Sequence, residues 1–121
     1  MMAALEAARD ALAAIAGVAS CKIGLEANIT PADYPLIRLV PARITPGRPY
    51  GNRTVEVLIY FGMDRGEAED GLETVYQKLF ELESSILTVI KTLQGRYVET
   101  LTDSDELPTY KVMAIRCELQ G

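Results

Sequence analysis

The segment from residue 72 to residue 93 carries one apolar stripe at helical spacing, and this stripe sets the strongest limit on the fold. Its apolar residues recur every three or four positions: Leu72, Val75, Tyr76, Leu79, Leu82, Ile86, Ile90 and Leu93. Glu69 and Asp70 suit the positive N-terminal end of a helix, and Gly95 is expected to close it. A helix that is apolar along one side needs a second layer to pack against.

An earlier segment, residues 2–17, is rich in alanine and leucine and is also predicted to be an amphipathic helix, with Gly17 at its end. The letters "VASC" that follow look like the cleavage box of a bacterial lipoprotein. However, Glu6, Arg9 and Asp10 together are net negative where an export signal carries positive charge, so we interpret the segment as a helix rather than a targeting sequence. No apolar run approaches the roughly 20 residues of a membrane span.

Four segments read as strands. The clearest is "RTVEVLIYFG" (53–62), in which apolar side chains alternate, so that one face holds Val55, Val57, Ile59 and Phe61. "LIRLVPARI" (36–44) is β-like but contains Pro41, which cannot donate to a ladder, so we expect an edge strand or a strand broken there. "RYVETLT" and "TYKVMAIRCEL" supply the last two strands. Residues 18–35 are expected to be irregular.

The elements follow the order α-β-β-α-β-β, which predicts a two-layer α+β fold. An antiparallel sheet of about four strands, built from two β-hairpins, would have both helices on one face. The 121 residues suffice for a single domain, 1–121, with its own core. Several strands carry apolar residues on both faces, and we expect this to reflect self-association through the sheet, although ordinary scatter of surface apolar residues is the alternative.

Composition excludes several classes of function. The chain has no histidine, so it cannot hold a Ser-His-Asp or Cys-His site. Cys21 and Cys117 form no CxxC motif and are expected to be reduced thiols, with a single disulfide as the alternative. The net charge of −5 argues against general binding to duplex DNA or to anionic membranes.

One segment breaks the acidic pattern. Residues 34–55 contain no Asp or Glu and carry +4, which leaves −9 for the rest of the chain. Prolines and glycines at positions 46–51 shape a turn there. The interpretation is a presented basic hairpin that contacts an acidic surface or nucleic acid through Arg43, Arg48, Tyr50 and Arg53. A loop that only increases solubility is the alternative.

Carboxylates offer little sign of catalysis. Asp103, Asp105 and Glu106 lie within four residues and are expected to form a solvated turn. An acidic docking turn for basic loops is the second interpretation and a metal site is the third, because the spacing matches no complete metal-binding loop. Glu56 and Glu118 could be imagined as a hydrolytic pair, but nothing in the sequence places them in one cleft. We therefore expect no enzyme and no cofactor.

The order of these elements resembles the tail terminator (tail completion) proteins of long-tailed bacteriophages. The resemblance rests on "YPLIRLVPARI", "RTVEVLIYFG", "GLETVYQKLFELESSILTVIKTL" and "ETLTDSDELPTYKVMAIRCEL", and it covers most of the chain. It carries over no catalytic or binding residue. Members of that family are small α+β chains whose hexameric ring caps the tail tube, stops its growth and offers a surface to the head connector.

The resemblance implies a structural protein of the virion tail, assembled in the host bacterial cytoplasm. Its partners would be further copies of itself, the tail tube protein and the head-tail connector protein, with non-specific DNA contact in the ring lumen as an added expectation and no membrane. Two alternatives stay open: another neck protein of the head-tail connector, or a small dimeric cytoplasmic ligand-binding domain with a regulatory role. An enzyme that uses the Asp103–Glu106 cluster with a metal is a third.

Overall fold

The computed structural model describes residues 2–24, 31–45, 53–64, 72–102 and 110–120. The elements within these ranges are α1 (Met2–Ala13), β1 (Ser20–Ile23), the 3₁₀ turn η1 (Pro31–Asp33), β2 (Leu36–Thr45), β3 (Thr54–Asp64), α2 (Leu72–Thr92), β4 (Arg96–Leu101) and β5 (Tyr110–Gln120). The chain is thus α+β, as predicted.

The sheet has five strands in the order β1-β2-β3-β5-β4, rather than the four expected. The two predicted hairpins are present, because β2 pairs antiparallel with β3 and β4 pairs antiparallel with β5. The expectation of a purely antiparallel sheet was wrong, since β1 pairs parallel with β2 and makes the sheet mixed. β1 falls inside the segment expected to be irregular. Its four residues are held by pairing with β2 rather than by any pattern of their own.

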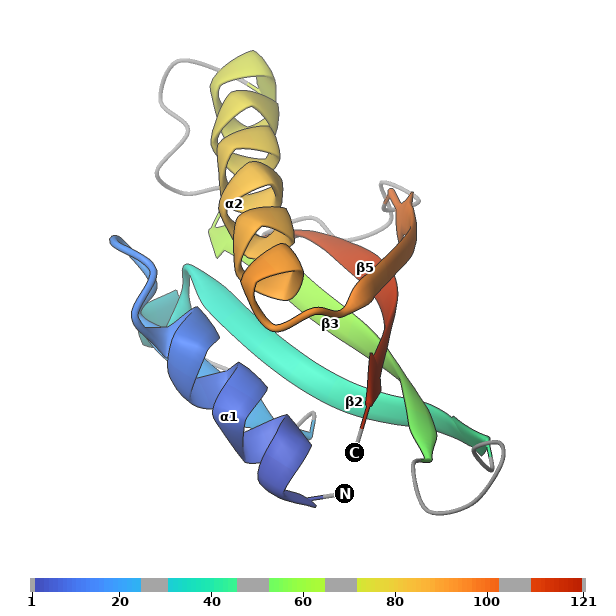
Figure 1. Cartoon of the computed structure of the whole chain (residues 1–121). Coiled ribbons are helices and arrows are strands. Elements are labelled where there is room, and N and C mark those ends of the chain that lie inside the picture. The colour runs from blue at the N-terminus through green and yellow to red at the C-terminus, as the bar shows by residue number, and fades with distance from the viewer. Residues whose placement is uncertain (1, 25–30, 46–52, 65–71, 103–109, 121) are drawn as a thin grey trace.

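Both helices cover the same face of the sheet, as the sequence predicted (Figure 1). α1 contributes Leu5, Ala8 and Leu12 to the core. α2 contributes Val75, Leu79, Leu82, Ile86 and Ile90. Beneath them lies the predicted apolar face of β3, with Val55, Val57, Ile59 and Phe61 all buried. A sheet covered on one face only leaves its outer face to solvent or to partners.

Pro41 lies where β2 can tolerate it. The pairing of β1 with β2 ends at Ile23 and Leu39, so from Val40 onward β2 is an edge strand among the described residues. The register with β3 also shifts between Pro41 and Arg43, which marks a β-bulge. Edge strands and bulges are the two places where a sheet accepts proline, and the sequence prediction for this residue is confirmed.

The helices end differently from the prediction. α1 stops at Ala13, four residues early, because Ile15 and Val18 donate backbone hydrogen bonds three residues back to Leu12 and Ile15. α2 stops at Thr92, and Gln94 rather than a glycine takes the left-handed conformation, with φ 59°. Gly95 then donates its N–H to the carbonyl of Ile90 at 2.9 Å, which satisfies one of the last helical carbonyls.

Candidate functional site

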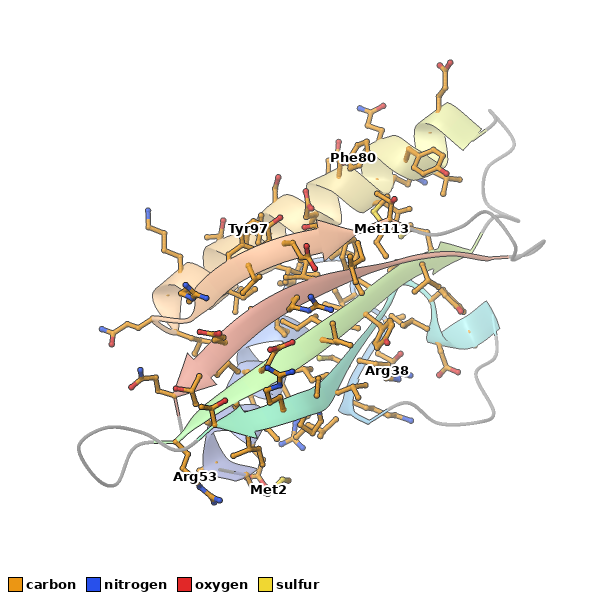
Figure 2. All side chains as sticks on the ribbon, turned by 90° about the vertical axis from the view of Figure 1, so that its right-hand side faces the viewer. Met2, Arg38, Arg53, Phe80, Tyr97 and Met113 are labelled. Carbon is orange, nitrogen blue, oxygen red and sulfur yellow. The ribbon has the colours of Figure 1, made fainter. Side chains whose placement is uncertain are left out.

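The basic hairpin projects from one end of the sheet. β2 reaches Thr45 and β3 begins at Thr54, and both Arg43 and Arg53 are exposed. Figure 2 shows Arg53 at the end of the molecule, beyond the strands. Ile44 follows Arg43 in β2, lies on the opposite face of the strand, and has 49% of its surface exposed. Arg48 and Tyr50, the other two predicted contact residues, lie outside the described residues. The described residues on the two sides of this turn therefore combine positive charge with an exposed aliphatic side chain.

Arg38 does not belong to this surface, although it lies in the same acid-free segment, residues 34–55. It is fully buried, on the face of β2 away from the helices (Figure 2). Its Nη1 donates to Ser20 Oγ at 3.0 Å and to the Ile37 carbonyl at 2.9 Å. Ser20 Oγ in turn donates to the Asp33 carbonyl at 2.7 Å. Arg38 therefore ties β1, β2 and η1 together, which is a structural role for a hydrogen-bonded buried cation.

The outer face of the sheet carries an alternating set of charges that sequence reasoning missed. Glu56 and Glu118 are direct partners across β3 and β5. Each carboxylate is paired with an arginine, since Arg116 Nε lies 3.2 Å from Glu56 Oε1 and Arg96 Nε lies 3.0 Å from Glu118 Oε2. Arg116 Nη1 also donates to Glu99 Oε1 at 2.7 Å. The signal for this arrangement was the spacing of charges on predicted strands, but only the register makes the residues neighbours.

This pairing argues against the hydrolytic pair considered for Glu56 and Glu118. Their partners are fixed arginines on an open sheet face rather than groups around a cleft. The side chains of Arg116 and Glu56 are 37% and 25% exposed, so the ion pairs are partly screened and stabilise the fold weakly, by about 0–1 kcal/mol each. The charges define the sheet surface rather than a site for acid–base chemistry.

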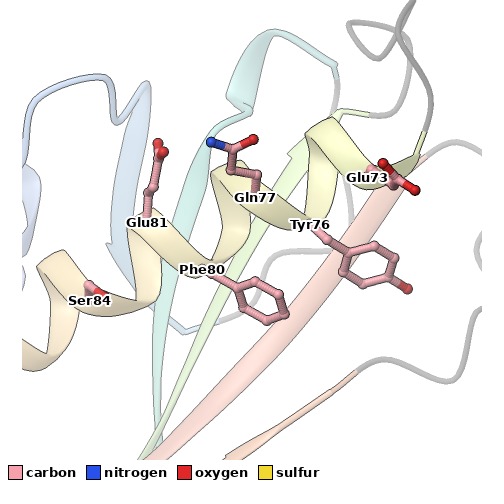
Figure 3. A pocket seen from close by; sticks show the side chains of 6 residues that line it. All are labelled: Glu73, Tyr76, Gln77, Phe80, Glu81 and Ser84. Carbon is pink, nitrogen blue, oxygen red and sulfur yellow. The ribbon is translucent and has the colours of Figure 1, made fainter.

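A second exposed surface lies on α2. Tyr76 and Phe80, one helical turn apart, stack with their ring centroids 6.2 Å apart and their planes at 29°. Phe80 is 52% exposed. We define the α2 aromatic patch as the six residues that line the hollow here (Figure 3): Glu73, Tyr76, Gln77, Phe80, Glu81 and Ser84. An aromatic pair beside two carboxylates is a surface suited to a cation.

The strand β4 forms one edge of the sheet. No described strand pairs with its other side, and its exposed apolar residues are Tyr97, Val98 and Leu101. The register with β5 shifts between Tyr97 and Glu99, so Val98 is the extra residue of a bulge. An exposed sheet edge with apolar side chains is a template for pairing with another chain, although a bulge limits it.

Both cysteines are free thiols, as expected. Burial raises the pKa of the Cys21 thiol from 9.0 to about 11, and the nearby cations Arg38 and Arg9 oppose this only in part. Burial also raises the pKa of Cys117 from 9.0 to about 12, with a further contribution from the neighbouring Glu118 carboxylate. Thiols with raised pKa values are poor nucleophiles, so neither is suited to catalysis.

The predicted acidic turn, Asp103, Asp105 and Glu106, lies outside the described residues. Within the described ranges, no three Asp, Glu, Cys or His side chains come together in a way that could hold a metal ion. None of the described helices has both the length and the apolar character needed to cross a membrane. The chain matches no protein-family model, and no curated protein is significantly similar to it.

Proposed function

We propose that this chain is a structural protein of a long-tailed bacteriophage, a tail terminator whose copies form a hexameric ring on the tail tube. The ring ends polymerisation of the tube and gives the head connector a surface to join. The protein acts in the virion tail after assembly in the host bacterial cytoplasm. The two-layer α+β arrangement with both helices on one face supports this proposal, because the resemblance in sequence implies that arrangement.

The observation that carries the proposal is the combination of a sheet edge, β4, that no other described strand covers and exposed apolar side chains. Tyr97, Val98 and Leu101 are exposed along β4, and Phe80 is exposed on α2. Exposed apolar surface next to an unpaired strand is a liability in a protein that stays monomeric. A subunit of a cyclic assembly buries such surface on every copy.

The assembly state tests the proposal directly. Sedimentation velocity and negative-stain microscopy would be carried out on the chain alone and on the chain mixed with the tail tubes of its own phage. We expect rings in at least one of the two samples, and tubes capped at one end. A protein that stays monomeric in both samples, at high concentration, would contradict the proposal. Rings that bind the isolated head connector but never the tube would favour the neck-protein alternative.

A pair of matched variants asks whether the exposed edge takes part. Val98→Lys places a charge at an exposed position of the edge strand β4, and Thr88→Lys places the same charge at an exposed position of α2. Lysine on an edge strand opposes edge-to-edge pairing. We expect Val98→Lys to reduce ring formation and Thr88→Lys to leave it unchanged, with both proteins melting like the original chain. Equal ring formation by all three proteins would exclude β4 from the contact.

The ligand-binding alternative has one observation in its favour. A hollow of about 250 Å³ lies between the end of α1 and the side of α2, and its lining includes Val18, Met63, Lys78 and Leu82. Ligand pockets usually enclose about 300–1,000 Å³, so this hollow suits at most a small molecule. If a metabolite raised the melting temperature of the original chain but not that of Met63→Lys, the result would support the ligand-binding function instead.

A further inference from the structure

We propose that the basic hairpin of one copy docks on the α2 aromatic patch of the next copy. The inference rests on the proposed ring-forming function and specifies two surfaces that meet in the ring. Its partner is a second copy of this chain, rather than the tail tube or DNA.

The hairpin supplies the positive surface. Within the described residues, neither Arg43 nor Arg53 forms an ion pair or a side-chain hydrogen bond. Arg43 lies directly opposite Glu56 in the ladder, but that carboxylate is paired with Arg116 instead. The whole window from residue 34 to residue 55 contains no acid. The positive charge at this end of the sheet is therefore presented outward.

The α2 aromatic patch supplies the negative surface. Glu73 and Glu81 are exposed on α2, and neither forms an ion pair within the described residues. The patch itself contains no Lys or Arg. Lys78, the nearest cation along the helix, lines the hollow on the α1 side, which Glu81 also lines, so Glu73 is the patch carboxylate farther from this cation. The hairpin and the patch are thus complementary in charge, which steers and orients association.

The chemistry of the two surfaces also matches. An arginine guanidinium can lie over an aromatic face while its N–H groups donate to carboxylates. The patch offers both kinds of partner. The rings of Tyr76 and Phe80 project from one side of α2 with Glu73 at the Tyr76 end, and Glu81 projects from the other side of the helix (Figure 3). The exposed side chain of Ile44 pairs with Val55 and lies on the face of β2 opposite to Arg43, where it can cover the apolar ring. Charge and apolar area therefore occur at the same end of the sheet in the hairpin and on the same two turns of α2 in the patch.

The positions of the surfaces require two molecules. The hairpin lies at one end of the sheet, whereas the patch lies toward the N-terminal half of α2 at the opposite end, in both views (Figures 1 and 2). One chain therefore cannot pair its own hairpin with its own patch. A contact between two different surfaces of identical copies is heterologous, and repeating it gives a closed ring or an open filament.

Two charge-reversed proteins test the contact. The hairpin variant is Arg43→Glu/Arg53→Glu, and the patch variant is Glu73→Arg/Glu81→Arg. Each variant places like charges across the proposed interface, so we expect self-association to weaken by about 100-fold. Mixed in equal amounts, the two variants restore opposite charges at every contact of an alternating ring. We therefore expect the mixture to assemble, into rings with an even number of copies.

Sedimentation velocity and native mass spectrometry measure the outcome, with and without tail tubes. Glu6→Arg and Lys91→Glu are the controls, because each makes one charge reversal of the same kind at an exposed position outside both surfaces, half the charge change of the corresponding double variant. Circular dichroism checks that each protein melts like the original. If a charge-reversed protein melts lower, Arg43→Gln/Arg53→Gln and Glu73→Gln/Glu81→Gln repeat the test with smaller changes.

Failure of the inference differs visibly from failure of the proposed function. If the original chain forms rings and the charge-reversed variants form them equally well, the inference is wrong and the ring function stands. The same holds if both variants lose assembly but their mixture does not restore it. Loss in the hairpin variant alone would assign the hairpin to the tail tube or to DNA. An original chain that never assembles overturns the function itself.

Discussion

The junction between α2 and β4 leaves no room for a side chain at Gly95, and this makes Gly95→Ala an informative change. A methyl group there would lie 2.9 Å from Ile90 Cγ2, 2.9 Å from Leu119 Cδ2 and 3.3 Å from the Glu118 carbonyl oxygen. Ile90 and Leu119 are both buried in the core. The neighbours must therefore move within a packed layer, which costs about 1–3 kcal/mol.

An opposing effect reduces this cost. Alanine has fewer backbone conformations than glycine in the unfolded chain, which stabilises the folded state by about 0.4–1 kcal/mol. The φ of Gly95 is not in the left-handed region, so no backbone strain is added. The net loss of unfolding free energy is then about 0.5–2 kcal/mol, and for a chain of this size each kcal/mol lowers Tm by about 3–6 °C.

Urea unfolding followed by circular dichroism measures the loss, and a double-mutant cycle with Leu119→Ala assigns its cause. Removal of Leu119 Cδ2 relieves one of the two closest contacts, so the double variant should be more stable than the sum of the single effects predicts. Additivity within about 0.3–0.5 kcal/mol would refute the steric argument. Gly17→Ala is the contrasting variant, because no atom lies within 4 Å of its added methyl group. The φ of Gly17 is +89°, so any loss of unfolding free energy in this variant comes from backbone strain rather than from a steric clash.

Two further predictions concern the core and the thiols. Ile86→Ala, in the buried face of α2, should lower the unfolding free energy by about 2–5 kcal/mol. Phe80→Ala, on the exposed face, should change it by less than about 0.5 kcal/mol. Equal losses of unfolding free energy in urea would contradict this and show that Phe80 is packed within the monomer. Cys21 and Cys117 have pKa values raised to about 11 and about 12 in the folded chain, from 9.0. Because the folded chain keeps each thiol protonated to a higher pH than the unfolded chain does, the stability that the thiols contribute is fully present below about pH 9. It is lost as the pH rises through about 11 and about 12. Unfolding curves between pH 8 and pH 11 for Cys117→Ala and the original chain check this, and parallel pH profiles would contradict it.

The elements that local pattern determines could be predicted from sequence. The stripe of α2 and the alternation of β3 are repeated signals, and the structure buries the predicted face of each. β1 could not be predicted, because four residues carry little pattern and their parallel pairing with β2 depends on contacts distant in sequence. The early end of α1 was missed because the alanines after Ala13 favour helix intrinsically, while the turn at Gly17 overrides them.

The candidate site was only partly accessible to the same reasoning. The exposed Arg43 and Arg53 follow from a charged, turn-rich hairpin. The burial of Arg38 does not, because it depends on Ser20 being brought beside β2 by a strand that the sequence concealed. The α2 aromatic patch was hidden for another reason. Tyr76 was assigned to the apolar stripe, and nothing in the spacing indicates that Phe80 stacks on it at the edge of the packed face.

The two bulges have a consequence for the lengths that related chains can have. Pro41, Val57, Cys117 and Tyr97 form one row across β2, β3, β5 and β4, and both outer strands gain their extra residue directly next to this row. The inner strands gain none there, so each outer strand follows a longer path around the same bend. Loss of Ala42 or Val98 would straighten its strand and still leave every later side chain on its present face. Evolution can therefore shorten this sheet by one residue at either position without turning its core outward, whereas the same deletion in β3 would exchange the core and the surface.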